Sequence, residues 1–168
     1  MELYLIRHAE AAPLGEGGVN EDEDRPLTEA GREQSRLLAD GLKRLGIGLD
    51  LVLTSPLIRA RHTAEGMLEK WGQPTPELHV AEELAPGGRR GKLARRLRRQ
   101  GRGRIALIGH APSINRFAAW LMGSKKSKLE LTKAGVAYIH CEDGAGKGEG
   151  VLLWLATPDW MQRSLPSA

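Results

Sequence analysis

Two arginines and two histidines stand at or just beyond the ends of short apolar runs. Arg7 and His8 end the run LYLI, His110 ends the run RIALIG, and Arg59 follows the run LDLVLT. Guanidinium forks match phosphate oxygens and stay charged at any working pH. A helix that begins shortly before Arg59 adds the positive end of its dipole. Brought together, these residues suit the binding of a phosphoryl group.

The apolar runs can bring these residues together. The run LYLI contains neither glycine nor proline, which is typical of a strand buried on both faces of a parallel sheet. Parallel strands present their carboxyl ends at one edge, where open α/β proteins bind ligands. We expect strands over residues 3–6, 49–54, 78–80, 104–109, 136–141 and 151–156, and helices over 29–45, 56–70, 91–100 and from 114 onward.

Three hydroxyl residues are predicted N-caps of these helices. Thr28, Ser55 and Ser113 each precede a helical pattern and could accept a backbone N–H of the first turn. Pro56 suits the first helical position after Ser55. Arg59 is therefore expected in the first turn of its helix.

The alternation of strands and helices predicts the fold class. We expect an α/β fold of three layers, with a mainly parallel central sheet flanked by helices on both faces. The chain has 168 residues, so residues 1–168 are expected to form a single domain. We expect no signal peptide, no membrane span and, with Cys141 as the one cysteine, no internal disulfide. These features favour a cytoplasmic protein.

The charge distribution is uneven although the net charge is only +4. Residues 89–104 hold nine basic residues and no acidic one, whereas residues 16–24 hold five acidic ones. Such asymmetry favours an anionic substrate, an acidic partner or a polyanion. The alternative for 89–104 is a solvated helix face. Nucleic acid is disfavoured, because aromatic residues that could stack on bases are scarce near this segment.

The remaining histidines are interpreted as structural. His62, His79 and His140 do not end buried apolar runs, unlike His8 and His110. His62 could border the site, since it lies three residues beyond Arg59, but no role is assigned to it.

Four ordered motifs resemble the histidine phosphatase superfamily, also called the phosphoglycerate-mutase-like fold. LIRHAEA resembles the family's Arg-His-Gly signature, with Ala9 in place of the usual glycine. RPLTEAG at 25–31 resembles the segment before its first helix, TSPLIRARHTAE at 54–65 the segment with its second arginine, and IGHAP at 108–112 the segment with its second histidine. The small size and the segment EELAPGG are most similar to the SixA-type phosphohistidine phosphatases.

The resemblance implies roles for individual residues. His8 is the nucleophile and forms a phosphohistidine intermediate, which requires a neutral imidazole. Arg7, Arg59 and His110 bind the phosphoryl oxygens, and the two arginines together with the helix N-terminus disfavour protonation of His8. No metal and no other cofactor is needed, since the arginines supply the positive charge. Glu83 is the candidate general acid.

The role of Glu83 stays open, as does that of Glu82, the second candidate for the acid. Both could simply be solvated loop residues, and SixA-type proteins depart from the family's pattern here. A phosphoramidate substrate would need a strong acid less, because its leaving nitrogen can take a proton from solvent.

The residues and the resemblance together favour a metal-independent phosphatase, with phosphohistidine in a protein as the leading substrate. A small-molecule phosphomonoesterase is the enzymatic alternative, whereas a mutase fits less well because extra segments for a sugar acid are not found. The non-enzymatic alternative is a polyanion-binding module that uses residues 89–104. The expected partner is a phosphorylated substrate, with no membrane involved.

Overall fold

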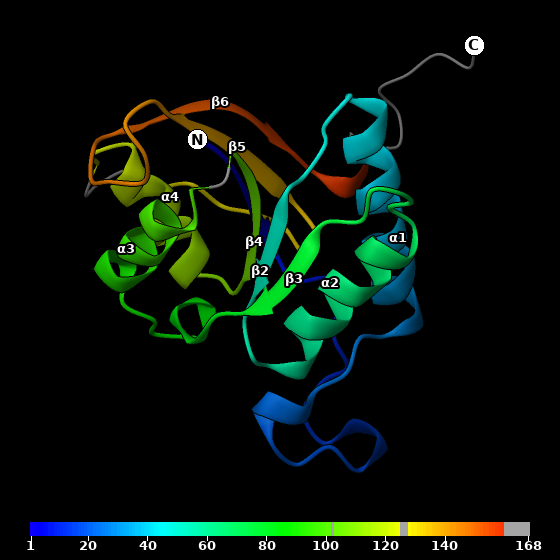
Figure 1. The fold of residues 1–168 in the computed structure, drawn as a ribbon. Coiled ribbons are helices and arrows are strands. Elements are labelled where there is room, and N and C mark those ends of the chain that lie inside the picture. The colour runs from blue at the N-terminus through cyan, green and yellow to red at the C-terminus, as the bar shows by residue number, and fades with distance from the viewer. Residues whose placement is uncertain (102, 125–127, 160–168) are drawn as a thin grey trace.

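The computed structural model describes residues 1–101, 103–124 and 128–159. Its centre is a six-stranded sheet in the order β3-β2-β4-β1-β5-β6. Figure 1 shows α1 and α2 on one face of this sheet and α3 and α4 on the other, which confirms the three-layer α/β prediction. The strands are β1 (Glu2–Arg7), β2 (Leu51–Thr54), β3 (Glu77–Val80), β4 (Arg104–Gly109), β5 (Val136–Cys141) and β6 (Gly150–Ala156). The α-helices are α1 (Glu29–Arg44), α2 (Ile58–Glu69), α3 (Arg90–Gln100) and α4 (Ser113–Leu121), and the 3₁₀ turns are η1 (Glu16–Gly18), η2 (Asp22–Asp24) and η3 (Glu82–Leu84).

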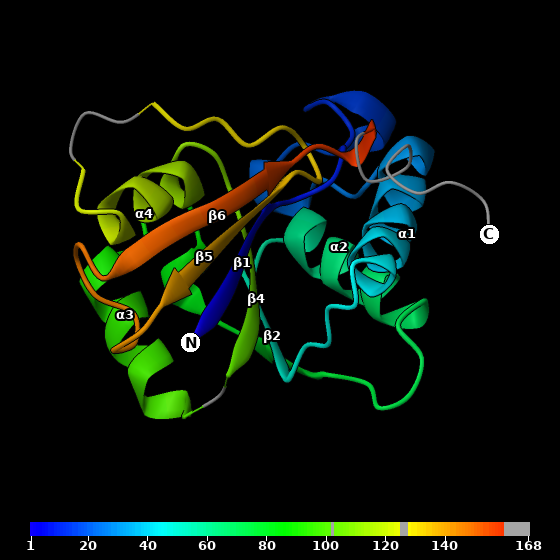
Figure 2. The same ribbon diagram turned by 90° about the horizontal axis from the view of Figure 1, so that it is seen from above.

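The sheet is mixed but mainly parallel, as predicted. Strands β1 to β4 pair in parallel, whereas β5 pairs antiparallel with both β1 and β6. Figure 2 shows β5 and β6 as a hairpin beside β1. The predicted strands fall within two residues of the observed bounds. Within the described ranges, no helix is both long and apolar enough to cross a bilayer.

Two hydrophobic cores lie on opposite faces of the sheet, and β1 contributes to both. Leu3 and Leu5 face α3 and α4, while Tyr4 and Ile6 face α1 and α2, because successive strand residues point to opposite faces. Leu93 and Leu97 of α3 are buried in the core on the side of α3 and α4. They are four residues apart and therefore lie on the same face of the helix. Since β1 is locked on both faces, the residues that follow it are held firmly in place.

The helix starts follow the predicted caps only in part. Thr28 caps α1, since its hydroxyl accepts the N–H of Gly31 at 3.0 Å. The prediction for Ser113 is wrong: Ser113 is the first residue of α4, and its hydroxyl accepts the N–H of Gly87 at 3.2 Å. Ser113 therefore joins α4 to the loop after η3 rather than capping its own helix.

The prediction that Ser55 caps α2 is also wrong. The helix begins at Ile58, and its N-cap residue, Leu57, makes no side-chain capping bond. The hydroxyl of Ser55 accepts the N–H of Leu57 at 3.3 Å and also bonds the side chain of His110. The Ser55 side chain, which was expected to cap α2, thus bonds to His110 at the end of the neighbouring strand β4.

Candidate active site

The register of β1 and β4 brings the two histidines together. Arg7 is paired with Gly109, and the N–H of His8 donates to the Gly109 carbonyl at 3.0 Å. His8 and His110 therefore leave the sheet next to each other, with imidazole centroids 5.0 Å apart and planes inclined by 51°. Both side chains are buried, with His8 8% and His110 3% exposed. The predicted meeting of these residues at one sheet edge is confirmed.

The tautomer of His8 follows from its backbone partner. Its Nδ1 lies 2.7 Å from the carbonyl oxygen of Ala9. A carbonyl can only accept, so Nδ1 carries the proton and Nε2 keeps a free lone pair. The backbone of Ala9 is also fixed from α2, because its N–H donates to Thr63 Oγ1 at 3.0 Å and that hydroxyl donates to the carbonyl of Arg59 at 2.7 Å. The fold thus defines which nitrogen of the neutral imidazole keeps its lone pair.

Alanine fits at the position where the family signature has glycine. Ala9 is fully buried in a small cluster with Ala11, Leu27 and Ala134. Among the described residues other than glycine, only Ala134 has a positive φ, so the backbone at Ala9 does not need glycine. The departure from the signature leaves the site geometry intact.

The two arginines are held by their terminal nitrogens. Arg7 Nη1 donates to the carbonyl of Leu131 at 3.0 Å, and Arg59 Nη2 donates to Asp22 Oδ2 at 2.9 Å. Arg59 Nη1 donates to the backbone carbonyl of Asp22. Within the part of the chain that the structure describes, Arg7 Nε, Arg59 Nε and His110 Nδ1 are buried and have no partner. Unsatisfied buried donors of this kind are costly unless a ligand satisfies them.

The acidic loop supplies two further residues that sequence pattern alone did not identify. Asp22, in η2, pairs with Arg25 as well as with Arg59, at 2.9 Å in each case. Arg25 also donates through Nε to the carbonyl of Ala12 at 2.6 Å. Hydrogen bonds from Arg25, with the charge of Arg59, lower the pKa of the Asp22 carboxyl. The motif RPLTEAG and the acidic cluster were the available signals, but neither shows which carboxylate meets Arg59.

Burial keeps both histidines neutral. It lowers the pKa of His8 to about 4, with the positive charges of Arg59 and Arg7 adding to the effect and the hydrogen bond to Ala9 opposing it. Burial also lowers the pKa of His110 to about 3, with His8 and Arg59 acting in the same direction. The prediction of a neutral His8 is confirmed in direction. Its main cause differs, because desolvation outweighs the arginines.

The two candidate acids lie on η3, close to the end of β4. Glu83 pairs with Arg96 of α3, with 3.4 Å between Oε2 and Nη1, and Glu82 is exposed. Arg96 also donates to the carbonyl of Val80 at 3.0 Å. In the part of the chain described, no contact of Glu83 reaches His8 or His110. The acid role of Glu83 stays a prediction.

The basic segment 89–104 forms α3 and its flanks, with Arg102 outside the described residues. Arg96 and Arg98 are bonded within the protein, to Glu83 and to the carbonyl of Ala145. Arg89, Lys92 and Arg99 are exposed and have no ion pair among the described residues. Part of the segment thus stabilises the fold, and part faces solvent.

Comparison with known proteins identifies relatives over the length of the chain. An uncharacterized protein of Picosynechococcus sp. is 36% identical over 169 residues, covering 96% of this chain and 99% of the relative. The phosphohistidine phosphatase SixA of Escherichia coli is 29% identical over 161 residues, covering 94% of each. A solved structure of the protein histidine phosphatase SixA complexed with tungstate superposes with a TM-score of 0.82 at 28% identity, covering 95% of this chain and 98% of that one.

The family model of the histidine phosphatase superfamily (branch 1) matches residues 3–92. This range contains the first three of the four motifs and both arginines of the site. The match covers more than half of the chain, and the fold and the paired histidines agree with it. The chain therefore belongs to the histidine phosphatase superfamily.

Proposed function

We propose that the protein is a metal-independent phosphatase that forms a phosphohistidine at His8 and acts on phosphohistidine in proteins. The observation that carries the proposal is the arrangement around His8 Nε2. A neutral imidazole with a defined lone pair lies beside His110, among buried N–H donors that lack a partner in the described part of the chain. Such donors suit the oxygens of a phosphoryl group.

The reaction has two displacement steps. In the first, His8 Nε2 attacks phosphorus, a P–N bond forms, and the bond to the leaving group breaks with its electron pair going to the leaving atom. That atom gains a proton. In the second step water attacks the phosphorus, the P–N bond to His8 breaks, and inorganic phosphate and neutral His8 are released. The water loses one proton in this step, so the overall result is hydrolysis.

Arg7, Arg59 and His110 are proposed to hold the equatorial oxygens. The N–H groups that they offer are Arg7 Nε, Arg59 Nε and His110 Nδ1. Because bonds to Leu131 and Asp22 position the two guanidinium groups before the substrate arrives, their charge is available to stabilise the transition state. The two guanidinium groups supply positive charge that a metal ion supplies in other phosphoryl-transfer enzymes.

Phosphohistidine is the proposed substrate for two reasons. The chain is similar over its length to SixA of Escherichia coli, whose name gives phosphohistidine phosphatase. The carboxylate of Glu83 is paired with Arg96, so a strong acid at the leaving group is not preassembled. An imidazole leaving group tolerates this, because its ring can take a proton from solvent before the P–N bond breaks and then leave as neutral imidazole, whereas an ester oxygen is too weakly basic to be protonated in advance.

Replacement of the nucleophile tests the mechanism. We expect His8→Ala to lower kcat/KM for N-phosphoimidazole by at least about 10³-fold, because the covalent step is lost. Wild-type protein should be quenched during turnover in a denaturant without acid. Mass spectrometry should then detect one added phosphoryl group on the wild-type protein and none on His8→Ala. His79→Ala, which changes an exposed imidazole, should retain activity. Activity that survives His8→Ala would exclude this mechanism.

Comparison of leaving groups tests both the substrate class and Glu83. We expect Glu83→Gln to slow hydrolysis of phenyl phosphate more than that of N-phosphoimidazole, because only the phenoxide-type and alkoxide leaving groups depend on an acid. Equal and severe losses on both substrates would rule out the phosphoramidate argument. A panel that adds phosphotyrosine and sugar phosphates distinguishes a small-molecule phosphomonoesterase, which would prefer a sugar phosphate.

A further inference from the structure

A large groove runs along α4 on the face of the sheet that also carries α3. Its volume is about 840 Å³, and α4 forms one wall while residues 128–130 form another. Lys147, from the connection between β5 and β6, and Arg90, the first residue of α3, also line the groove. We call this cavity the α4 groove.

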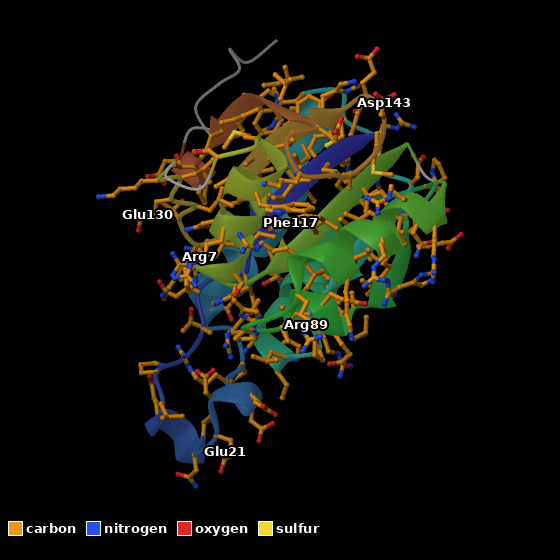
Figure 3. All side chains as sticks on the ribbon, turned by 90° about the vertical axis from the view of Figure 1, so that its left-hand side faces the viewer. Arg7, Glu21, Arg89, Phe117, Glu130 and Asp143 are labelled. Carbon is orange, nitrogen blue, oxygen red and sulfur yellow. The ribbon has the colours of Figure 1, made fainter. Side chains whose placement is uncertain are left out.

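The α4 groove lies near the proposed phosphate site, although none of the four residues of that site lines it. Its lining includes Pro112, two residues after His110, and Glu130, the neighbour of Leu131. The carbonyl of Leu131 holds Arg7 at 3.0 Å. Figure 3 shows Arg7 and Glu130 on the left of the molecule and Asp143, from the loop between β5 and β6, at the upper right. Because Pro112 is only two residues from His110, a polypeptide held at His8 would need few residues to reach the groove.

The lining of the α4 groove is basic. Arg90, Arg116, Lys128 and Lys147 come from four separate segments, and among the described lining residues Glu130 is the one acidic side chain. None of the four cations has an ion pair or a side-chain hydrogen bond to the residues that the structure describes. They differ in this from the bonded Arg96 on α3. Unpaired cations around a groove attract an anionic partner.

The floor of the groove is apolar and suits polypeptide rather than nucleic acid. Trp120 and Leu129 are half-buried and line it. One face of Trp120 stacks on Phe117, with centroids 5.8 Å apart, and its carbonyl accepts the N–H of Gly148 at 3.2 Å. A single anchored indole cannot provide the series of stacking faces that single-stranded nucleic acid uses. It can receive an apolar side chain between flanking acidic ones.

We infer that the α4 groove binds an acidic stretch of the phosphoprotein substrate, next to the phosphorylated residue in the site. This inference rests on the proposed function, because it takes the phosphorylated residue to be part of a polypeptide. The groove supplies affinity for the carrier protein, whereas the site supplies the chemistry. Selectivity among phosphoproteins then follows from the charge of the segment beside the phosphorylated residue.

Three synthetic phosphohistidine peptides of equal length test the inference, with acidic, neutral or basic flanks. At low salt we expect kcat/KM to be roughly tenfold higher for the acidic than for the neutral peptide, and the difference to vanish near about 0.5 M NaCl. The double variant Arg116→Glu, Lys147→Glu should abolish the preference. Lys43→Glu, Lys70→Glu is the matched control on the other face of the sheet, and should keep it.

Small-substrate turnover separates this inference from the proposed function. N-phosphoimidazole does not extend into the groove, so its kcat/KM should change less than about twofold in the double variant. If the wild-type protein hydrolyses neither N-phosphoimidazole nor the phosphohistidine peptides, the proposed function is contradicted. The groove would then be tested by fluorescence anisotropy of the labelled, unphosphorylated acidic peptide on His8→Ala. No preference for acidic flanks, equal losses in both double variants, or displacement of the peptide by an oligonucleotide would overturn the inference.

Discussion

Ser55 determines which nitrogen of His110 carries a proton. The Ser55 hydroxyl lies 2.8 Å from His110 Nε2 and accepts the N–H of Leu57 at 3.3 Å. Among the described residues, His110 Nε2 is the one acceptor found for the hydrogen of this hydroxyl, so Ser55 donates to Nε2 and the neutral imidazole carries its proton on Nδ1. That is the buried nitrogen without a partner among the described residues, so the fold presents a donor where the proposed mechanism needs one.

Removal of this hydroxyl should impair activity through the tautomer of His110. We expect Ser55→Ala to lower kcat about tenfold or more with a smaller change in KM, since a buried nitrogen loses its partner. The ¹⁵N chemical shifts of His110 at neutral pH should move toward a mixture of tautomers. Ser35→Ala, which also removes a buried hydroxyl, is the control and should change neither. Unchanged ¹⁵N shifts in Ser55→Ala would contradict the assignment.

The residues of the site were predictable to different degrees. Arg7, His8 and His110 end apolar runs, so hydrophobic pattern alone places them at one sheet edge. Ser55 was predicted to be a cap, since helix-start patterns cannot reveal a partner that comes from a neighbouring strand. Asp22 was visible only as part of an acidic cluster, because the conformation of a loop depends on contacts that have no periodic pattern.

At the scale of elements, the contact between α1 and the segment after β1 holds the backbone beside His8 in place. A Cβ added to Gly31 would lie 1.9 Å from the carbonyl oxygen of Glu10. The same oxygen accepts the N–H of Thr28 at 3.1 Å, and the N–H of Glu10 donates to Gln34 at 2.9 Å. The backbone two residues after His8 is thus packed directly against the first turn of α1.

Gly31→Ala should therefore weaken both the fold and the site. We expect a loss of roughly 2–4 kcal/mol in the free energy of unfolding by urea, because the obstructing atom belongs to the backbone and cannot rotate away. Activity on N-phosphoimidazole should fall as well. Gly91→Ala in α3 is the matched control, since its added Cβ meets nothing within 4 Å. It should raise the free energy of unfolding by about 0.4–1 kcal/mol, and a similar loss in both variants would refute the packing argument.

Element boundaries were predictable where side chains act locally. Thr28 caps α1 as predicted, because the cap and the helix are adjacent in sequence. The start of α2 was predicted two residues too early, at Pro56 instead of Ile58. The intervening residues are held by the end of β2, where the N–H of Ser55 donates to the carbonyl of Ile108 at 3.0 Å. A bond to a neighbouring strand thus overrides the local signal.

At the scale of the molecule, folding removes the two histidines of the site from water. The sheet register and the two helical layers bury His8 and His110 beside two guanidinium groups. A folded chain then holds these imidazoles neutral, whereas an unfolded chain lets them bind protons near the ordinary pKa of 6.5. The proposed function and stability are linked through the same two groups, since the neutral form that the proposed attack requires is the form that folding favours.

Stability should therefore decrease as the pH falls. Between pH 6.5 and the folded-state pKa of about 4 for His8 and about 3 for His110, the unfolded chain binds more protons than the folded one. We expect the free energy of unfolding, measured by urea titration with tryptophan fluorescence, to fall from about pH 7.5 to pH 5, above the range where most carboxyl groups titrate. The double variant His8→Asn, His110→Gln should show a much smaller slope, whereas His79→Gln should keep the wild-type slope because this imidazole is exposed. An unchanged slope in the double variant would show that the buried histidines do not cause the pH dependence.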